Sequence, residues 1–483
     1  MQSSRLCSLL KALSTRERSR FREFLYSPYH NKREKIRQLF DHIAPFAPHF
    51  DHLDLNKPWL FQQLFGDAPY SDPRINNVIS DCLHLLYDFL AQEQFRQQDM
   101  LKKDFTLEAL LNREAHRDID RLSRWYREGL DRRPQRNADF YYKEHLLYDK
   151  LDRFFFTKGQ RSYDANLQRK SDSLDVFYLA SKFRIACDMA SRNTVTEATY
   201  ECHLLEDLLR YYQAHRPALD AHTLIGIFYK TLLMLTEREQ EQHYYDLKAQ
   251  LAVQAHLFTD EELRELYIYP LNYCIKKINS GRSDYYAEVL DIYKMMLDKK
   301  IAFRNGFLPQ WTFKNISTVG IRLKAYEWTE DFIDRYEQYL LPEERDNALA
   351  FNRAALFYAK KDFKQALQTL HNVDFVNTSY HLGAKIIQLK SYYELQETEA
   401  LYALIEASKK FIRRNRQLSE YGKKANLNFF KMARRIHHLR SLQSTESEAV
   451  FSRKYKTLLE SIGRSDSLAN KDWLEETIRS LVI

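Results

Sequence analysis

Turn-forming residues are scarce in this chain. Of its 483 residues, only 10 are glycine and 11 are proline, whereas average usage is about 7% and about 5%. β-Sandwiches, β-barrels and doubly wound folds need many turns marked by these residues, so the composition excludes them. Hydrophobic residues make up 44% and aromatic residues 14%, which excludes a disordered chain. We therefore predict a large, nearly all-α protein.

Motifs that carry catalysis or hold cofactors are also missing. The sequence has no G-x-G pair, no P-loop, no nucleophile elbow, no H-E-x-x-H and no Cys/His set with zinc spacing. The densest histidine group, His42, His49 and His52 beside Asp51 and Asp54, lies in a proline-bearing loop. Such groups arise by chance in a chain with 16 histidines. We expect no catalytic residue, no metal site and no cofactor, and thus not an enzyme.

Cysteines are few, and long apolar runs are absent. The five cysteines show no C-x-x-C spacing, which is typical of reduced, mostly buried thiols in a cytosolic protein. Lys11 interrupts the first leucine stripe, so we expect no signal peptide. The longest apolar stretch, residues 224–235, contains Lys230 and is shorter than the ~18 residues of a membrane span. We expect a cytoplasmic protein with no membrane span.

Helix signals divide the chain into four parts. Ser14 and Glu17 form a capping box, Asn31 is an expected N-cap, and Pro58 and Pro73 suit first helical turns. We predict an N-terminal helical domain at 1–98 and a helical array at 103–315. Tandem helix pairs are expected at 316–414, followed by a basic helix and C-terminal capping helices at 415–483. The last helix, at residues 473–482 after Asn470, is expected to cap the array.

Residues from about 348 to 373 carry the most specific pattern. Small residues stand at Ala354 and Ala366, where two helices of a hairpin touch, and Lys361-Asp362-Phe363 makes the turn. This segment resembles a tetratricopeptide (TPR) repeat, a helix–turn–helix of about 34 residues. It departs from the family at Lys361, where a glycine is usual, and at Val373, where an alanine is usual.

A similar unit follows at 389–405, and another precedes it at 316–340. The TPR-like resemblance therefore covers about 316–414, and it implies an α-solenoid that binds partners without catalysis. Unspecific helical hairpins fit the same pattern. Residues 290–316 also loosely resemble one pentatricopeptide unit, a repeat that reads RNA.

Adjacent aromatic pairs recur inside the predicted helices, among them Tyr141-Tyr142, Tyr211-Tyr212, Tyr244-Tyr245 and Phe429-Phe430. On a helix buried on two sides, one ring of each pair can pack against each neighbour. We interpret these pairs as packing residues of the core.

Positive charge gathers at both ends of the chain. Residues 1–37 have ten Lys/Arg against three acids, and residues 409–440 have eleven against Glu420 alone, whereas 237–265 are acidic. A basic surface can face nucleic acid, an anionic membrane or an acidic protein, or simply be solvated. The candidate partner-binding residues are Lys409, Lys410, Arg413, Arg414, Arg416, Lys423, Lys424, Lys431, Arg434 and Arg435.

These observations predict a non-enzymatic scaffold that binds a protein or peptide, with an acidic partner favoured, in a solenoid groove. The alternative is an RNA- or DNA-binding helical-repeat protein that uses the basic surfaces at 1–37 and 409–440.

Overall fold

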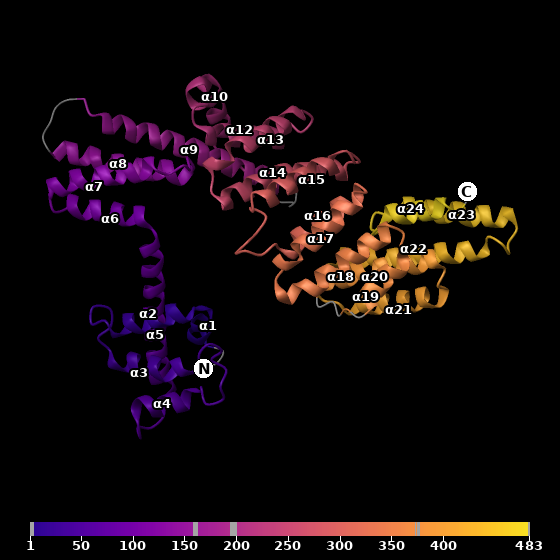
Figure 1. Ribbon diagram of the computed structural model, residues 1–483, viewed down its shortest axis with the longest axis horizontal. Coiled ribbons are helices and arrows are strands. Elements are labelled where there is room, and N and C mark those ends of the chain that lie inside the picture. The colour runs from indigo at the N-terminus through magenta and orange to yellow at the C-terminus, as the bar shows by residue number, and fades with distance from the viewer. Residues whose placement is uncertain (1–3, 158–162, 194–199, 372, 374–376, 482–483) are drawn as a thin grey trace. The chain divides into compact units, whose positions relative to one another are not determined.

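The chain is all-α in its computed structural model, which describes residues 4–157, 163–193, 200–371, 373 and 377–481. These described residues form 24 α-helices and no β-strand (Figure 1). The all-α prediction is confirmed. The chain divides into two compact units, Met1–Ser181 and Lys182–Ile483, with the boundary inside helix α9. The four smaller domains of the sequence analysis remain a prediction.

The first unit holds eight helices and most of a ninth. Their bounds are α1 Arg5–Ala12, α2 Thr15–Tyr26, α3 Glu34–Ile43, α4 Lys57–Phe65, α5 Asp72–Gln97, α6 Asp99–Leu111, α7 His116–Asp131, α8 Ala138–Thr157 and α9 Ala165–Arg192, with a 3-10 turn at Ala44–Phe46. Helices α1 to α5 share one hydrophobic core, in which Leu10, Phe21, Leu39 and Ile75 are fully buried. Gln98 joins α5 to α6, at the end of the first predicted domain.

Local sequence explains where several of these helices begin. The Ser14 side chain accepts a hydrogen bond from the Glu17 backbone N–H, and the Glu17 carboxylate accepts one from the Ser14 backbone N–H. This confirms the predicted capping box. The Asn31 prediction was wrong, because α3 begins two residues later, after Arg33. The buried Asn31 side chain donates to the Leu25 carbonyl oxygen and accepts from the Arg33 N–H instead.

The second unit holds the rest of α9 and fifteen further helices. Their bounds are α10 Leu205–Ala214, α11 Arg216–Leu219, α12 Thr223–Thr236, α13 Gln242–Gln254, α14 Asp260–Asn279, α15 Tyr285–Asp298, α16 Gln310–Arg322, α17 Tyr326–Tyr336, α18 Pro342–Ala359, α19 Phe363–His371, α20 Thr378–Leu395, α21 Thr398–Arg414, α22 Glu420–Leu442, α23 Glu448–Gly463 and α24 Lys471–Arg479, with 3-10 turns at Ala255–Leu257 and Glu337–Tyr339.

Helices α16 to α21 pack as consecutive pairs. Helices α16 and α17, α18 and α19, and α20 and α21 pack pairwise, and α18 also packs on α16 and α20 (Figure 1). Ala354 of α18 and Ala366 of α19 are fully buried, as expected for small residues at a helix–helix contact. Lys361 adopts φ +64° at the turn, the left-handed conformation that glycine adopts most readily.

Helices α20 to α24 bury a common cluster that contains Leu389, Ile405, Phe429, Ile462 and Ile478. Helix α24 packs on α22 and α23 and buries Leu474, Ile478 and Leu481 in this cluster. The last residue of the predicted capping helix, Val482, lies outside the described residues. The apolar face of α24 explains why this helix is part of the core.

The aromatic pairs are placed differently from the prediction. In Tyr141-Tyr142, Tyr211-Tyr212 and Tyr244-Tyr245 one ring is buried, while the other is 43–44% exposed. Both rings of Phe429-Phe430 are buried. One ring of each of these tyrosine pairs therefore lies in the core and the other lies nearer the surface, where Tyr142 still packs against Phe177 of α9.

The cysteines match the expected pattern. Cys7, Cys82, Cys187 and Cys274 are free and buried, and Cys202 is partly exposed. Among the described helices, none is both long and apolar enough to cross a membrane.

Candidate partner-binding surface

Helices α21 and α22, with Arg416 in the segment that joins them, position the ten cations predicted as a partner-binding patch, which we call the basic surface. Leu401, Ile405 and Ile412 of α21 are buried in the core, as are Phe429 and Ile436 of α22. Their apolar residues recur at helical spacing, so the charged residues between them face outward. The Ser419 side chain accepts from the Gly422 backbone N–H and begins α22.

Three of the ten cations have acidic partners. Lys409 Nζ lies 3.0 Å from Glu406 Oε1, and Arg434 of α22 lies 2.9 Å from the same oxygen. Lys423 pairs with Glu420 at 2.7 Å. The hydrogen bond from Lys409, together with the charges of Arg434 and Arg413, lowers the pKa of Glu406. One carboxylate thus joins α21 to α22, and its single negative charge is shared by several cations.

The other seven cations are exposed, and no carboxylate of the described chain lies within 4.0 Å of their nitrogen atoms. They are Lys410, Arg413, Arg414, Arg416, Lys424, Lys431 and Arg435. Arg413 and Arg414 lie in the last turn of α21, where the helix dipole favours positive charge. This arrangement leaves an excess of positive charge that no neighbouring acid neutralises.

The N-terminal basic segment at residues 1–37 is also paired in part. Arg20 pairs with Glu93 at 2.5 Å, Arg22 pairs with Asp41 at 2.9 Å, and Arg33 pairs with Asp81. These acids come from α3 and α5 of the same bundle. Three of the ten cations counted at residues 1–37 therefore stabilise contacts within the first unit, the same number that are paired on the basic surface.

A hollow of about 320 Å³ lies between α22 and α23, next to the basic surface. Arg435, at its edge, is shared with that surface, and α23 contributes Arg453 and Lys454. The sequence analysis missed the α23 cations because they lie outside the dense run at 409–440. The short basic run Arg453, Lys454 and Lys456 was the signal that could have identified them.

A second hollow, of about 620 Å³, lies beside the C-terminal helix α24. Aromatic side chains of α18, α20 and α24 line it together with charges of both signs, namely Tyr358, Tyr393, Trp473, Arg440, Glu394 and Glu476. Burial raises the pKa of Tyr358 to about 12. Aromatic rings combined with mixed charge are features of surfaces that bind peptides.

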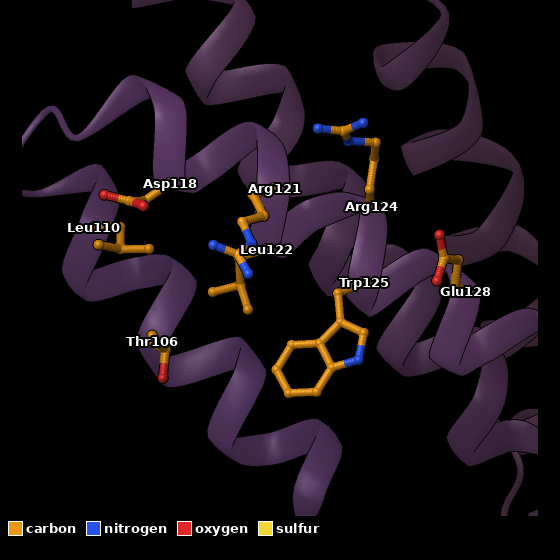
Figure 2. A pocket seen from close by; sticks show the side chains of 8 residues that line it. All are labelled: Thr106, Leu110, Asp118, Arg121, Leu122, Arg124, Trp125 and Glu128. Atoms are coloured by element: carbon orange, nitrogen blue, oxygen red, sulfur yellow. The ribbon is translucent and has the colours of Figure 1, made fainter.

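A third hollow, of about 780 Å³, belongs to the first unit and lies between α6 and α7. Figure 2 shows Trp125 and Leu122 of α7 on the side that faces Thr106 and Leu110 of α6. The Trp125 ring is 54% exposed, and the Lys103 ammonium lies 4.0 Å from its centroid. Sequence analysis missed this site, although a tryptophan on the arginine-rich face of a helix was a usable signal.

The histidines and cysteines of the described chain are placed as follows. Within the described ranges, no three His, Cys, Asp or Glu side chains are placed to hold a metal ion. His52 of the histidine group contacts Asp54 at 3.3 Å, and both side chains are more than half exposed. Burial raises the pKa of the Cys82 and Cys274 thiols to about 12, which suppresses the reactive thiolate.

What the geometry supplies is therefore a set of hollows lined by charged, aromatic and aliphatic side chains. No family model, curated protein or solved structure matches the chain.

Proposed function

We propose that this chain is a non-enzymatic binding protein whose basic surface on α21 and α22 takes an acidic segment of a partner protein. The observation that carries the proposal is the set of seven exposed cations that have no carboxylate within 4.0 Å in the described structure. Unneutralised charge of one sign favours a partner of the opposite sign.

One further feature supports a protein partner over nucleic acid. The hollow beside α24 offers Tyr358, Tyr393 and Trp473 together with the acids Glu394 and Glu476, and these carboxylates would repel a phosphate backbone.

The proposal extends to the class of fold and to the compartment. Tandem helix pairs with Ala354 and Ala366 buried at their contact support a TPR-like scaffold. Free, mostly buried thiols support a reducing compartment such as the cytoplasm.

The experiment is affinity capture of the full chain from cell lysate, with and without nuclease, followed by elution in a salt gradient. A variant with Arg413→Glu, Arg414→Glu and Arg434→Glu reverses the basic surface. A matched control reverses Lys299, Lys300 and Lys364, which are exposed and lie outside that surface.

We expect a protein that survives nuclease, is lost with the basic-surface variant and is kept by the control. Capture that both variants preserve would contradict the proposal. Nucleic acid that co-purifies and leaves between ~50 and ~200 mM salt would replace it with the nucleic-acid alternative.

A further inference from the structure

The hollow between α22 and α23 combines an apolar floor with a cationic rim. Leu439, Leu442 and Leu458 line it together with cationic and polar side chains of both helices. Leu439 and Leu458 are only 3% exposed and thus belong to the core beneath the hollow. Its volume of about 320 Å³ falls at the lower end of the ~300–1,000 Å³ typical of ligand sites.

The rim holds two arginines that come from different helices. Arg435 lies on α22 and Arg453 on α23, and both are exposed. Neither has a carboxylate within 4.0 Å among the residues that the structure describes, whereas Lys454 is paired with Glu446. Two guanidinium groups therefore border one small space, and neither forms an ion pair with a described carboxylate.

The hollow is continuous with the basic surface. Lys431, Arg435 and His438 are spaced i, i+4 and i+7 on α22, so they share one side of that helix. His438 and Thr457 add hydrogen-bonding groups to the rim. A segment lying along the basic surface can therefore place one side chain in this hollow.

We propose that this hollow binds the phosphate group of a phosphoserine or phosphothreonine in the acidic partner segment. This inference rests on the proposed function. A guanidinium group presents paired donors that match phosphate oxygens, and two of them can hold a group that carries a charge of about −1.5 to −2. The leucine floor takes an apolar residue next to the phosphorylated one, and a glutamate would satisfy only part of the rim.

The test uses three degenerate peptide libraries that differ only at the central position, which is phosphoserine, glutamate or serine. Every library carries acidic flanks and one leucine beside the central residue. The immobilised full-length chain is incubated with each library, and the retained peptide is quantified. We expect about tenfold more phosphoserine peptide than glutamate peptide to be retained, because hydrogen bonds to charged groups are strong.

The variant R435Q/R453Q is expected to abolish this preference. Because Arg435 also belongs to the basic surface, the variant is expected to weaken retention of the glutamate library without abolishing it. The matched variant K364Q/K456Q removes the same charge from exposed side chains that do not line the hollow, and it is expected to behave like the original chain. Circular dichroism of all variants checks that they fold.

The outcomes separate this inference from the function on which it rests. Equal retention of the phosphoserine and glutamate libraries overturns the phosphate site and leaves the acidic-partner proposal intact. A phosphoserine preference that survives R435Q/R453Q also overturns the site. Failure of every acidic library, together with retention of a single-stranded RNA oligonucleotide, overturns both proposals.

Discussion

The indole Nε1 of Trp473 donates a hydrogen bond to the hydroxyl oxygen of Tyr358 at 3.1 Å. The two residues are 115 positions apart and join the C-terminal helix α24 to α18. The Trp473 ring also meets the Tyr393 ring edge-on at 5.6 Å, and the Lys390 ammonium lies 5.4 Å from its centroid. The Trp473 side chain therefore joins α24 to α18 and α20.

Replacing Trp473 with phenylalanine removes the donor and keeps an aromatic ring. We expect the stability of the second unit to fall by about 1 kcal/mol, the usual net value of one such hydrogen bond. Urea unfolding followed by circular dichroism measures it. Tyr358→Phe should cost about the same, and the double variant should cost no more than either change alone. Fully additive effects would show that the two side chains do not interact.

Two glycines mark close helix contacts. A Cβ at Gly320 of α16 would lie 2.2 Å from Thr329 Oγ1, and one at Gly383 of α20 would lie 2.6 Å from a ring carbon of Phe351. Both neighbours are buried, so they cannot move aside freely. We expect Gly320→Ala and Gly383→Ala each to lower the stability by about 1–3 kcal/mol, measured as a shift of the thermal unfolding midpoint.

Gly463, at the end of α23, is the matched control. A Cβ there would meet nothing within 4 Å, and alanine is the better helix former by about 1 kcal/mol. Gly463→Ala should therefore leave the midpoint unchanged or raise it. A similar loss at all three glycines would contradict the steric explanation.

A buried ion pair joins α8 to α6 in the first unit. Lys150 is only 6% exposed in its side chain, and its Nζ lies 2.8 Å from Asp104 Oδ1 and 3.7 Å from Glu108 Oε2. Asp104→Asn leaves the buried ammonium with one distant carboxylate. We expect a loss of about 2 kcal/mol, because an uncompensated buried charge is costly. Urea unfolding of the full chain measures the change.

The control is Asp331→Asn, which breaks the exposed pair between Asp331 and Arg335 at 2.7 Å. Exposed pairs contribute about 0–1 kcal/mol, so this variant should be nearly neutral. If the two variants lost the same stability, burial would not be the cause of the Asp104 effect.

Local signals in the sequence predicted helices better than they predicted contacts. The capping box at Ser14 and the prolines at the starts of α4 and α5 were predicted correctly because each depends on residues a few positions apart. Asn31 does not cap α3, because its buried side chain donates a hydrogen bond to the carbonyl oxygen of Leu25, six residues away. Tertiary contacts outweigh a local preference of about 1 kcal/mol.

In the candidate site, too, the sequence predicted the residues but not the contacts between helices. The ten cations were identified from charge alone, but the position of Glu406 between Lys409 and Arg434 depends on how α21 packs on α22. Arg453 reaches the same hollow as Arg435 only because α23 folds back on α22. The periodicity of apolar residues within one helix does not show which other helix packs against it. These contacts therefore could not be predicted from the sequence.

Glu144 of α8 gives the chain a pH-dependent contribution to stability. Burial raises the pKa of its carboxyl group, Asp131 and Asp172 raise it further, and Arg169 and Arg136 oppose the shift. An acid with a raised pKa in the folded state favours folding while it is protonated. That contribution is complete below the ordinary glutamate pKa of about 4.3 and is lost as the pH rises through the raised value.

Glu144→Gln keeps the shape of the side chain and removes its charge. We expect the variant to unfold at a higher urea concentration than the original chain at neutral pH, with the difference disappearing near about pH 4, where the carboxyl group is protonated. Glu128→Gln removes the same charge from an exposed side chain of α7 and should not stabilise the chain at either pH. A Glu144→Gln variant that is less stable at neutral pH would mean that attraction to Arg169 and Arg136 outweighs the cost of burying the charge.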